Sequence, residues 1–355
     1  MIEAPESTTA KLCSFARAYH STYARKKIFD DSPVFDFMGL EQYEETGQLI
    51  GHNYQENLID PNLSFHSSDI VDKLNRYLMP IPISRAAFAG QALIGNTPTV
   101  KLSHIGLPDG VNLFAKLELF NPAGSVKDRV GKAMIEDAEQ TGRPKPGGTI
   151  IEATAGNTGL GIAFAALNKG YRVIFVVPTK FSEEKQTLLR ALGAEVINTP
   201  REEGMLGASA KADALRAEIP GAISLGQFVN PANPRVHYET TGPEIYRDLN
   251  GKIDFLIAGA GSGGTYSGVV KNPEIQGILA DPVGSTMGGG EHGDYDIEGI
   301  GNDFIADTMD MSLVDQVVKI TDTEAFDGTR ELAQREGIFA GSSSSAALAA
   351  YRPTP

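Results

Sequence analysis

One lysine, Lys127, stands where an amine could act as a nucleophile. It lies in the run NPAGSVKDRVG, in which residues 121–124 predict a turn and the residues after Ser125 predict the first turn of a helix. The start of a helix carries partial positive charge, which disfavours an ammonium ion and helps to keep an amine unprotonated. A lysine so placed suits Schiff-base chemistry, although most lysines near helix ends are solvated surface charges. Other motifs must therefore decide its role.

A second motif, TAGNTGLG over residues 154–161, follows the apolar run GTIIEA and opens a predicted helix. Its small residues permit close approach of the backbone, and the free N–H groups of a helix start can hold a carboxylate or a phosphate. The motif predicts an anion site. Taken alone it also fits many nucleotide-binding folds.

Two further turns carry hydroxyl groups and glycines. The run GAGSGGTYSG, 259–268, follows the apolar run DFLIA and could wrap a phosphate with its backbone N–H groups. Its spacing is not GxGxxG in a first βαβ unit, and no acidic residue follows at the expected distance, so an NAD site is disfavoured. The run GSSSSA, 341–346, offers hydroxyls at another strand-to-helix turn, where an ordinary helix cap is the alternative.

Elements that could position these turns alternate along the chain. Six β-rich runs are spread over 111–119, 148–154, 171–178, 195–199, 254–261 and 276–282, and helical patterns cover 125–142, 157–170, 182–193 and 208–220. Strands that alternate with helices and end in glycine-rich turns predict parallel sheets flanked by helices. The fold class is therefore α/β.

Capping residues mark the ends of these helices. Ser125 and Ser182 stand at predicted N-caps, and Gly142, Gly170 and Gly193 are expected to close their helices. After residue 268 only VVK precedes NPEIQG, which is too short for a full helix between two parallel strands. A deletion would explain this gap, and the final helix is likewise stopped early by RPTP.

Composition narrows the class of ligand. The formal net charge is -14 over 355 residues, which argues against nucleic acid or an anionic membrane surface as the main partner and favours small molecules. The single cysteine, Cys13, excludes an intramolecular disulfide and a cysteine-rich metal site, so a reducing cytoplasm fits best. A membrane span is not expected, since charged residues such as Lys169 and Arg172 interrupt the apolar runs. A signal peptide is not expected either, since residues 1–5 carry no basic start followed by a hydrophobic core.

Taken together, the motifs resemble those of the β-family, or fold type II, of pyridoxal-phosphate enzymes, in particular cysteine synthase and the catalytic core of cystathionine β-synthase. The resemblance covers about 94–346. Its motifs stand in the family's order: LIGNTP, NPAGSVKDR, the asparagine loop TAGNTG, QFVNPANP, the GxGGT loop, EGIG and a serine-rich turn. The resemblance implies two three-layer α/β lobes with largely parallel sheets, as in the tryptophan synthase β fold.

The resemblance also assigns roles to residues. Lys127 would form the Schiff base with pyridoxal 5'-phosphate and act as acid and base, and Asn157 would hydrogen-bond the phenolic oxygen of the cofactor ring. Ser343 would face the pyridine nitrogen, where a neutral hydroxyl makes the ring a weaker electron sink than a carboxylate would. The cofactor phosphate would be held by Gly261, Ser262, Gly263, Gly264 and Thr265. The amino-acid substrate would be bound by Thr154, Ala155, Gly156, Thr158, Gln227 and Gly299.

Two departures from the family pattern concern the site itself. Ala155 replaces the usual serine of the asparagine loop and removes one hydroxyl from the carboxylate site. Ser345 replaces a usual glycine beside the pyridine-facing turn, which adds a side chain where the backbone approaches closely. Altered or weakened activity is one expectation. No haem is expected, because Cys13 and His20 do not match the haem ligands of cystathionine β-synthase in context.

Several reactions remain open within this family. The reaction implied is β-replacement on serine or an O-activated serine through an aminoacrylate. The stretches 230–246 and 281–305 are more similar to cystathionine β-synthase, so homocysteine is the favoured acceptor, with sulfide and a cysteine synthase reaction as the alternative. Another nucleophile, a serine or threonine dehydratase and a non-catalytic binding module are the further alternatives. A methyltransferase is disfavoured, because no glycine-rich cosubstrate loop follows ARAYHSTYARKKIFDD.

The predicted domain organisation has three parts. Residues 1–85 form a mostly helical N-terminal extension, 86–231 form the first α/β lobe and 232–355 form the second, with about 99–120 crossing into the second lobe. A family likeness implies a homodimer, and the aromatic-rich extension could cover the partner subunit.

Overall fold

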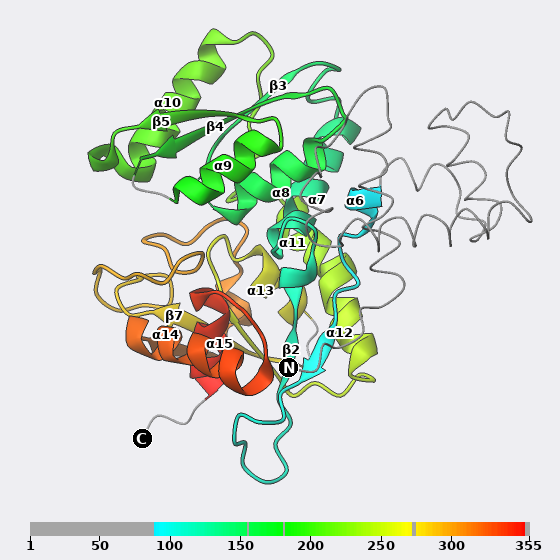
Figure 1. Cartoon of the computed structure of the whole chain (residues 1–355), viewed down its shortest axis with the longest axis vertical. Coiled ribbons are helices and arrows are strands. Elements are labelled where there is room, and N and C mark those ends of the chain that lie inside the picture. The colour runs from blue at the N-terminus through cyan, green and yellow to red at the C-terminus, as the bar shows by residue number, and fades with distance from the viewer. Residues whose placement is uncertain (1–88, 155, 180–181, 272–274, 352–355) are drawn as a thin grey trace, which may run out of the picture. The chain divides into compact units, whose positions relative to one another are not determined.

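The structure is a computed structural model, and it describes residues 89–154, 156–179, 182–271 and 275–351 (Figure 1). The helical extension predicted over 1–85 lies outside these residues, as do Ala155, Cys13 and His20.

Three parallel strands form the first sheet, in the order β3 (Thr149–Ala153), β4 (Arg172–Pro178) and β5 (Glu195–Thr199). Its helices are α7 (Lys127–Gln140), α8 (Asn157–Ala166), α9 (Glu183–Ala191) and α10 (Gly204–Glu218). Because successive side chains of a strand point to opposite faces, Ile150 and Phe175 pack with α7, α8 and α9, whereas Ile151 and Ile174 pack against α10. The sheet is thus the middle of three layers.

The second sheet is also parallel, in the order β6 (Phe255–Gly259), β7 (Gln276–Pro282) and β8 (Gln316–Ile320). Its helices are α13 (Gly264–Val270), α14 (Asp322–Glu331) and α15 (Ser342–Tyr351). Ala280 and Ile320 pack with α14 and α15, while Leu279 points to the other face and packs against Tyr266 of α13. In the view of Figure 1 the first sheet lies above the second, and α11 and α13 lie between them.

A hairpin and a long helix complete the described fold. Strands β1 (Thr99–Lys101) and β2 (Phe114–Lys116) pair antiparallel, and Leu102 and Leu117 next to them share a core with Leu348 of α15. The helix consists of α11 (Ala232–Val236), a π-helical segment (His237–Thr241) and α12 (Gly242–Asp248). Short helices cover Ala89–Ala92 (α6), Glu118–Phe120, Arg201–Glu203, Met311–Leu313 and Leu332–Glu336.

The predicted α/β class with parallel sheets is confirmed. Ser182 caps α9 by accepting a hydrogen bond from the backbone N–H of Lys185. Gly142 and Gly193, with positive φ angles of 71° and 85°, directly follow the C-caps of α7 and α9 and close these helices as predicted. The prediction for Gly170 was wrong, because α8 already ends at Ala166 and the left-handed residue after its C-cap is Asn168, with a φ of 62°. The lobe boundaries at 85/86 and 231/232 stay predictions.

The connection between β6 and β7 is short, as the sequence indicates. Helix α13 has only 7 residues, and it still joins two adjacent parallel strands. No helix in the part of the chain that the structure describes is long and apolar enough to cross a membrane.

Candidate active site

Lys127 is the first residue of α7, and its neighbours fix the turn before it. Residue 126 already has helical backbone angles, and the Ser125 hydroxyl before it accepts the Lys127 N–H at 3.1 Å. Ser125 therefore caps the start of α7, as the sequence predicts. The carboxylate of Asp128 accepts the N–H of Ala123 at 2.6 Å. These bonds tie the turn to the first turn of the helix.

Both side chains at this helix start are electrostatically strained. Burial lowers the pKa of Lys127, although part of its surface stays accessible. No carboxylate pairs with its amine among the residues that the structure describes. Burial also raises the pKa of Asp128 to about 6, and its Oδ1 is a buried atom without a hydrogen-bond partner in the same residues. Lys127 is therefore closer to a neutral amine than a surface lysine.

Helices α7 and α8 touch through their backbones. A Cβ atom added at Gly161 would lie 2.2 Å from the carbonyl oxygen of Lys127, and one added at Gly131 would lie 2.3 Å from the carbonyl carbon of Gly161. Only glycine permits this approach. The contact fixes α8, which begins at Asn157, directly against the turn that carries Lys127.

The asparagine loop before α8 meets the segment around Gln227. Thr158 donates a hydrogen bond of 2.7 Å from its hydroxyl to the side-chain oxygen of Gln227. Thr154 and Thr158 are buried, Gly156 is half-buried, and Asn157 is exposed at the first turn of α8. Two of the residues predicted to bind the substrate carboxylate, 69 positions apart, are thus brought into contact.

Glu152, which the sequence analysis did not single out, holds the Gln227 segment in place. This buried side chain on β3 accepts hydrogen bonds from the hydroxyl of Ser224 at 3.0 Å, from the N–H of Gly226 at 3.1 Å and from the N–H of Leu225. Burial raises the pKa of Glu152, against the effect of these bonds. A glutamate inside the apolar run GTIIEA was the available signal, because a buried carboxylate needs such donors.

The glycine loop at the start of α13 lies against several segments. Asn233 donates to the Ser262 hydroxyl at 2.9 Å and to the backbone oxygen of Gln227 at 2.8 Å, which joins the loop to the carboxylate side. A Cβ at Gly263 would lie 2.3 Å from the Cβ of Met309, and Gly263 has a φ of 80°. A Cβ at Gly264 would lie 2.1 Å from the Oδ1 of Asn233. The glycines of this loop are therefore required by its packing.

The serine turn and the EGIG motif also converge here. A Cβ at Gly299 would lie 3.9 Å from the Ser343 hydroxyl, and a Cβ at Gly261 would lie 2.7 Å from the Gly299 oxygen. Ser345, by contrast, is fully buried against α14, and its hydroxyl is 2.8 Å from that of Thr329. The side chain added by this departure therefore serves the α14–α15 contact.

His237 is a second residue that the sequence analysis did not single out. Its Nε2 lies 3.1 Å from the Thr265 hydroxyl and its Nδ1 lies 2.9 Å from the Thr241 hydroxyl, and the ring is completely buried. Desolvation lowers its pKa well below the usual value, helped by the charges of Lys127 and Arg129. The dipeptide HY inside a helical stretch gave no signal, because the contact depends on how two helices pack.

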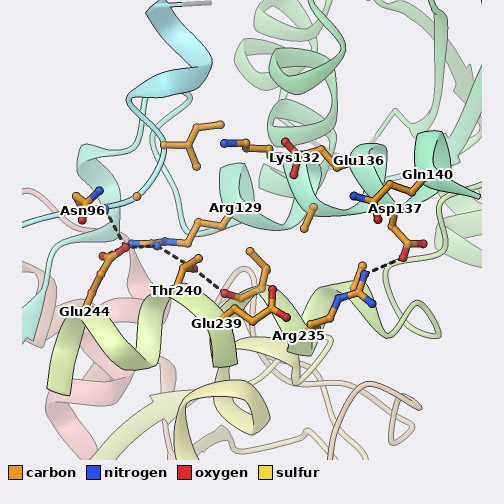
Figure 2. A pocket seen from close by; sticks show the side chains of 15 residues that line it. Asn96, Arg129, Lys132, Glu136, Asp137, Gln140, Arg235, Glu239, Thr240 and Glu244 are labelled. Carbon is orange, nitrogen blue, oxygen red and sulfur yellow. Dashed lines mark hydrogen bonds and ion pairs between the residues drawn. The ribbon is translucent and has the colours of Figure 1, made fainter. Parts of the chain in front are cut away.

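An ion-pair network joins the LIGNTP motif to α7 beside a pocket of about 500 Å³, and Figure 2 shows the part of it formed by Arg129, Glu244 and Asn96. Arg129 contacts Glu118 at 2.8 Å and Glu244 at 2.7 Å. Burial would raise the pKa of Glu244, but hydrogen bonds from Arg129, from the Asn96 N–H and from Lys116 lower it to about 2. None of the residues predicted for the cofactor or the substrate lines this pocket.

A lysine with a lowered pKa at a helix start, beside an asparagine loop and a glycine loop in an α/β fold, is the arrangement of an enzyme that holds a cofactor on a lysine. Comparison with known proteins identifies the family. A model of the pyridoxal-phosphate dependent enzyme family matches residues 91–354, and the chain belongs to this family. It is 49% identical over 261 residues to an O-acetylserine dependent cystathionine beta-synthase of Bacillus subtilis, covering 72% of this chain and 85% of that protein. It is 45% identical over 263 residues to a cysteine synthase of Staphylococcus aureus, and the match covers 72% of this chain and 84% of that protein.

A solved structure gives the same result. The O-acetylserine dependent cystathionine beta-synthase of Helicobacter pylori matches with a TM-score of 0.70 and 44% identity, covering 74% of this chain and 88% of that one. The chain is thus a pyridoxal-phosphate dependent enzyme of the cysteine synthase and cystathionine β-synthase type, which performs β-replacement. Its substrates are amino acids.

The residues present fit pyridoxal phosphate. The group needs an amine that is not consumed by an ion pair, and Lys127 is such an amine with a lowered pKa. It needs donors for a phosphate, and the glycine loop offers helix-start N–H groups beside the Ser262 and Thr265 hydroxyls. It also tolerates a neutral partner at its ring nitrogen, which Ser343 could supply.

Proposed function

We propose that Lys127 carries the cofactor and moves the protons of the reaction. Bound pyridoxal phosphate supplies an electron sink that lets the β-substituent of the amino acid leave. The lowered pKa of Lys127 favours a neutral amine, which can accept a proton at Cα and return it to the leaving group. The position of Lys127, set by the contact of α7 with α8, is the observation that carries this proposal.

We propose that the remaining predicted residues bind and orient. Gly261, Ser262, Gly263, Gly264 and Thr265 hold the cofactor phosphate, Asn157 holds the phenolic oxygen and Ser343 faces the ring nitrogen. Thr154, Ala155, Gly156, Thr158, Gln227 and Gly299 bind the substrate. The hydrogen bond between Thr158 and Gln227 supports the carboxylate site, because it aligns two polar side chains from opposite sides of the loop.

For the reaction itself, we propose that the thiol of homocysteine replaces the O-linked substituent on the β-carbon of an O-activated serine, so that a Cβ–S bond forms as the Cβ–O bond breaks and the substituent leaves. The stretches 230–246 and 281–305, which are similar to cystathionine β-synthase, favour this acceptor. Relatives named as O-acetylserine dependent cystathionine beta-synthases favour O-acetylserine as the donor. Synthesis of cysteine from sulfide is the second candidate, favoured by a 45% identical cysteine synthase.

Spectral titration tests these proposals. The protein reconstituted with pyridoxal phosphate is titrated with O-acetylserine, serine and O-phosphoserine, and homocysteine or sulfide is then added while the product is identified. We expect the absorbance to change with O-acetylserine and to return with homocysteine as cystathionine forms. Lys127→Ala is the control, in which the lysine-bound absorbance band should be lost. Rapid pyruvate release from serine without a thiol would instead indicate a dehydratase, and a wild-type protein without the band would indicate a binding module.

We further propose a homodimer in the cytoplasm. The single cysteine supports a reducing compartment, and the family likeness supports the dimer. Light scattering of the full chain at several concentrations checks the oligomeric state, and a monomer throughout would contradict it.

A further inference from the structure

A histidine outside the predicted set contacts the predicted phosphate loop. His237 is the first residue of the π-helical segment between α11 and α12. Gly268 of α13 packs on this segment, and a Cβ there would lie 2.6 Å from the Cβ of His237. The two helices are therefore in close contact, and His237 has little freedom to move away from Thr265.

The ring makes one hydrogen bond through each nitrogen. Nε2 lies 3.1 Å from the Thr265 hydroxyl and Nδ1 lies 2.9 Å from the Thr241 hydroxyl. A neutral imidazole has one donor nitrogen and one acceptor nitrogen, so the two hydroxyls must play opposite roles. Distances alone do not say which is which.

The chemistry of a phosphate decides between the two arrangements. The ionised oxygens of a phosphate only accept hydrogen bonds, so the Thr265 hydroxyl must donate its one hydrogen bond to the phosphate in order to bind it. The oxygen of Thr265 can then accept a bond from Nε2–H of His237. Nδ1 is left as the acceptor for the proton of the Thr241 hydroxyl.

We propose that His237 is a positioning residue for phosphate binding, which holds the Thr265 hydroxyl with its proton directed at the phosphate. The inference rests on the proposed function of the glycine loop and extends it to a relay from Thr241 through His237 to Thr265. Its neutral ring suits this role, because burial and the nearby charge of Arg129 disfavour a second proton. Because the hydrogen bond from His237 already fixes the Thr265 hydroxyl, phosphate binding does not have to pay the entropy of restricting its rotation.

Two substitutions separate the ring nitrogens. In His237→Gln the side-chain amide nitrogen stands near the place of Nε2, whereas His237→Asn reaches only the place of Nδ1. We expect His237→Asn to weaken the affinity of the apoprotein for pyridoxal phosphate about tenfold, the upper end of what one lost hydrogen bond between neutral groups costs. His237→Gln should stay within about twofold of wild type. His292→Asn is the matched control, since His292 is exposed and bonds Asp303.

A double-variant cycle tests whether His237 acts through Thr265. Affinity is measured by the absorbance of the lysine-bound cofactor, and the ³¹P resonance of the bound phosphate reports its surroundings. In the Thr265→Val background, His237→Asn should cause no further loss and no further ³¹P shift. Additive losses, or equal affinity of wild type and His237→Asn, would overturn the inference.

A measurement on the wild-type holoenzyme needs no variant to fold. The ¹⁵N resonances of labelled histidine give the tautomer of the buried ring, which we expect to carry its proton on Nε2. A proton on Nδ1 would overturn the inference even if His237→Asn does not fold. A wild-type protein that binds no pyridoxal phosphate would refute the proposed function and this inference together, whereas normal binding in every variant refutes only the inference.

Discussion

The contact between α7 and α8 makes a sharp prediction for Gly161→Ala. The new Cβ would lie 2.2 Å from the carbonyl oxygen and 2.7 Å from the carbonyl carbon of Lys127, and backbone atoms cannot rotate away. An ordinary contact begins at 3.4 Å, so the helices must separate by about 1 Å. The start of α7 would move with Lys127, because the clash is with the lysine's own carbonyl group.

Two measurements follow from this displacement. We expect the free energy of unfolding to fall by about 1–3 kcal/mol in urea titrations, the usual cost of overpacking. We expect kcat/KM for β-replacement to fall about 100-fold, because a misplacement of about 1 Å in a reacting group has that effect. Gly293→Ala is the control, since its Cβ would lie at an ordinary 3.5 Å from the Gly284 Cα.

The reasoning would be refuted by a Gly161→Ala protein with kcat/KM and stability within about twofold and about 0.5 kcal/mol of wild type. A loss of stability with unchanged kcat/KM would show that the helices separate without displacing the lysine. The proposed link between this contact and the chemistry would then be wrong.

Three further predictions concern buried groups. Glu244→Gln should lower the free energy of unfolding by about 3–5 kcal/mol at neutral pH, because it leaves the Arg129 charge less compensated. The difference in free energy of unfolding between wild type and Glu244→Gln should be complete above about pH 4.5 and should vanish as the pH falls towards the folded-state pKa of about 2. The reason is that a carboxyl group whose pKa is lowered on folding stabilises the native state only while it is ionised. Glu152→Ala should raise KM for the amino-acid donor more than it lowers kcat, because the Gln227 segment loses the acceptor of its N–H groups. Ser345→Gly should cost about 0.5–1.5 kcal/mol of stability and leave kcat unchanged, because its hydroxyl bonds Thr329 in a helix contact.

Each of these has a clear check. The prediction for Glu244→Gln is checked by urea titrations of wild type and variant between pH 2 and pH 7, and a difference in free energy of unfolding that does not depend on pH would contradict the assigned pKa of Glu244. Steady-state kinetics follow the second, and an unchanged KM with a reduced kcat would contradict it. For the third, Thr329→Val should reproduce the loss in stability, and a change in kcat for Ser345→Gly would place that residue in the site after all.

The sequence by itself determined the class of fold, the family and the order of the motifs. These follow from local patterns. The apolar runs that become β3, β4 and β6 alternate with helical segments along the chain, and glycine and asparagine determine the backbone conformation of the turns. Lys127 could be singled out because a turn and a helix start are local features. The proximity of the glycine loop and the asparagine loop could be expected only through the family resemblance.

Other features were decided only by the tertiary structure. The bond of His237 to Thr265 spans 28 residues, and that of Glu152 to Ser224 spans 72. Such contacts depend on the angle at which two elements cross and on the rotamers that the crossing permits, and neither is encoded in a local pattern. The same reason explains Ser345, which the sequence placed beside the site and which the packing of α15 on α14 turns into a helix contact. Sequence thus determines which groups are available, and packing determines which of them meet.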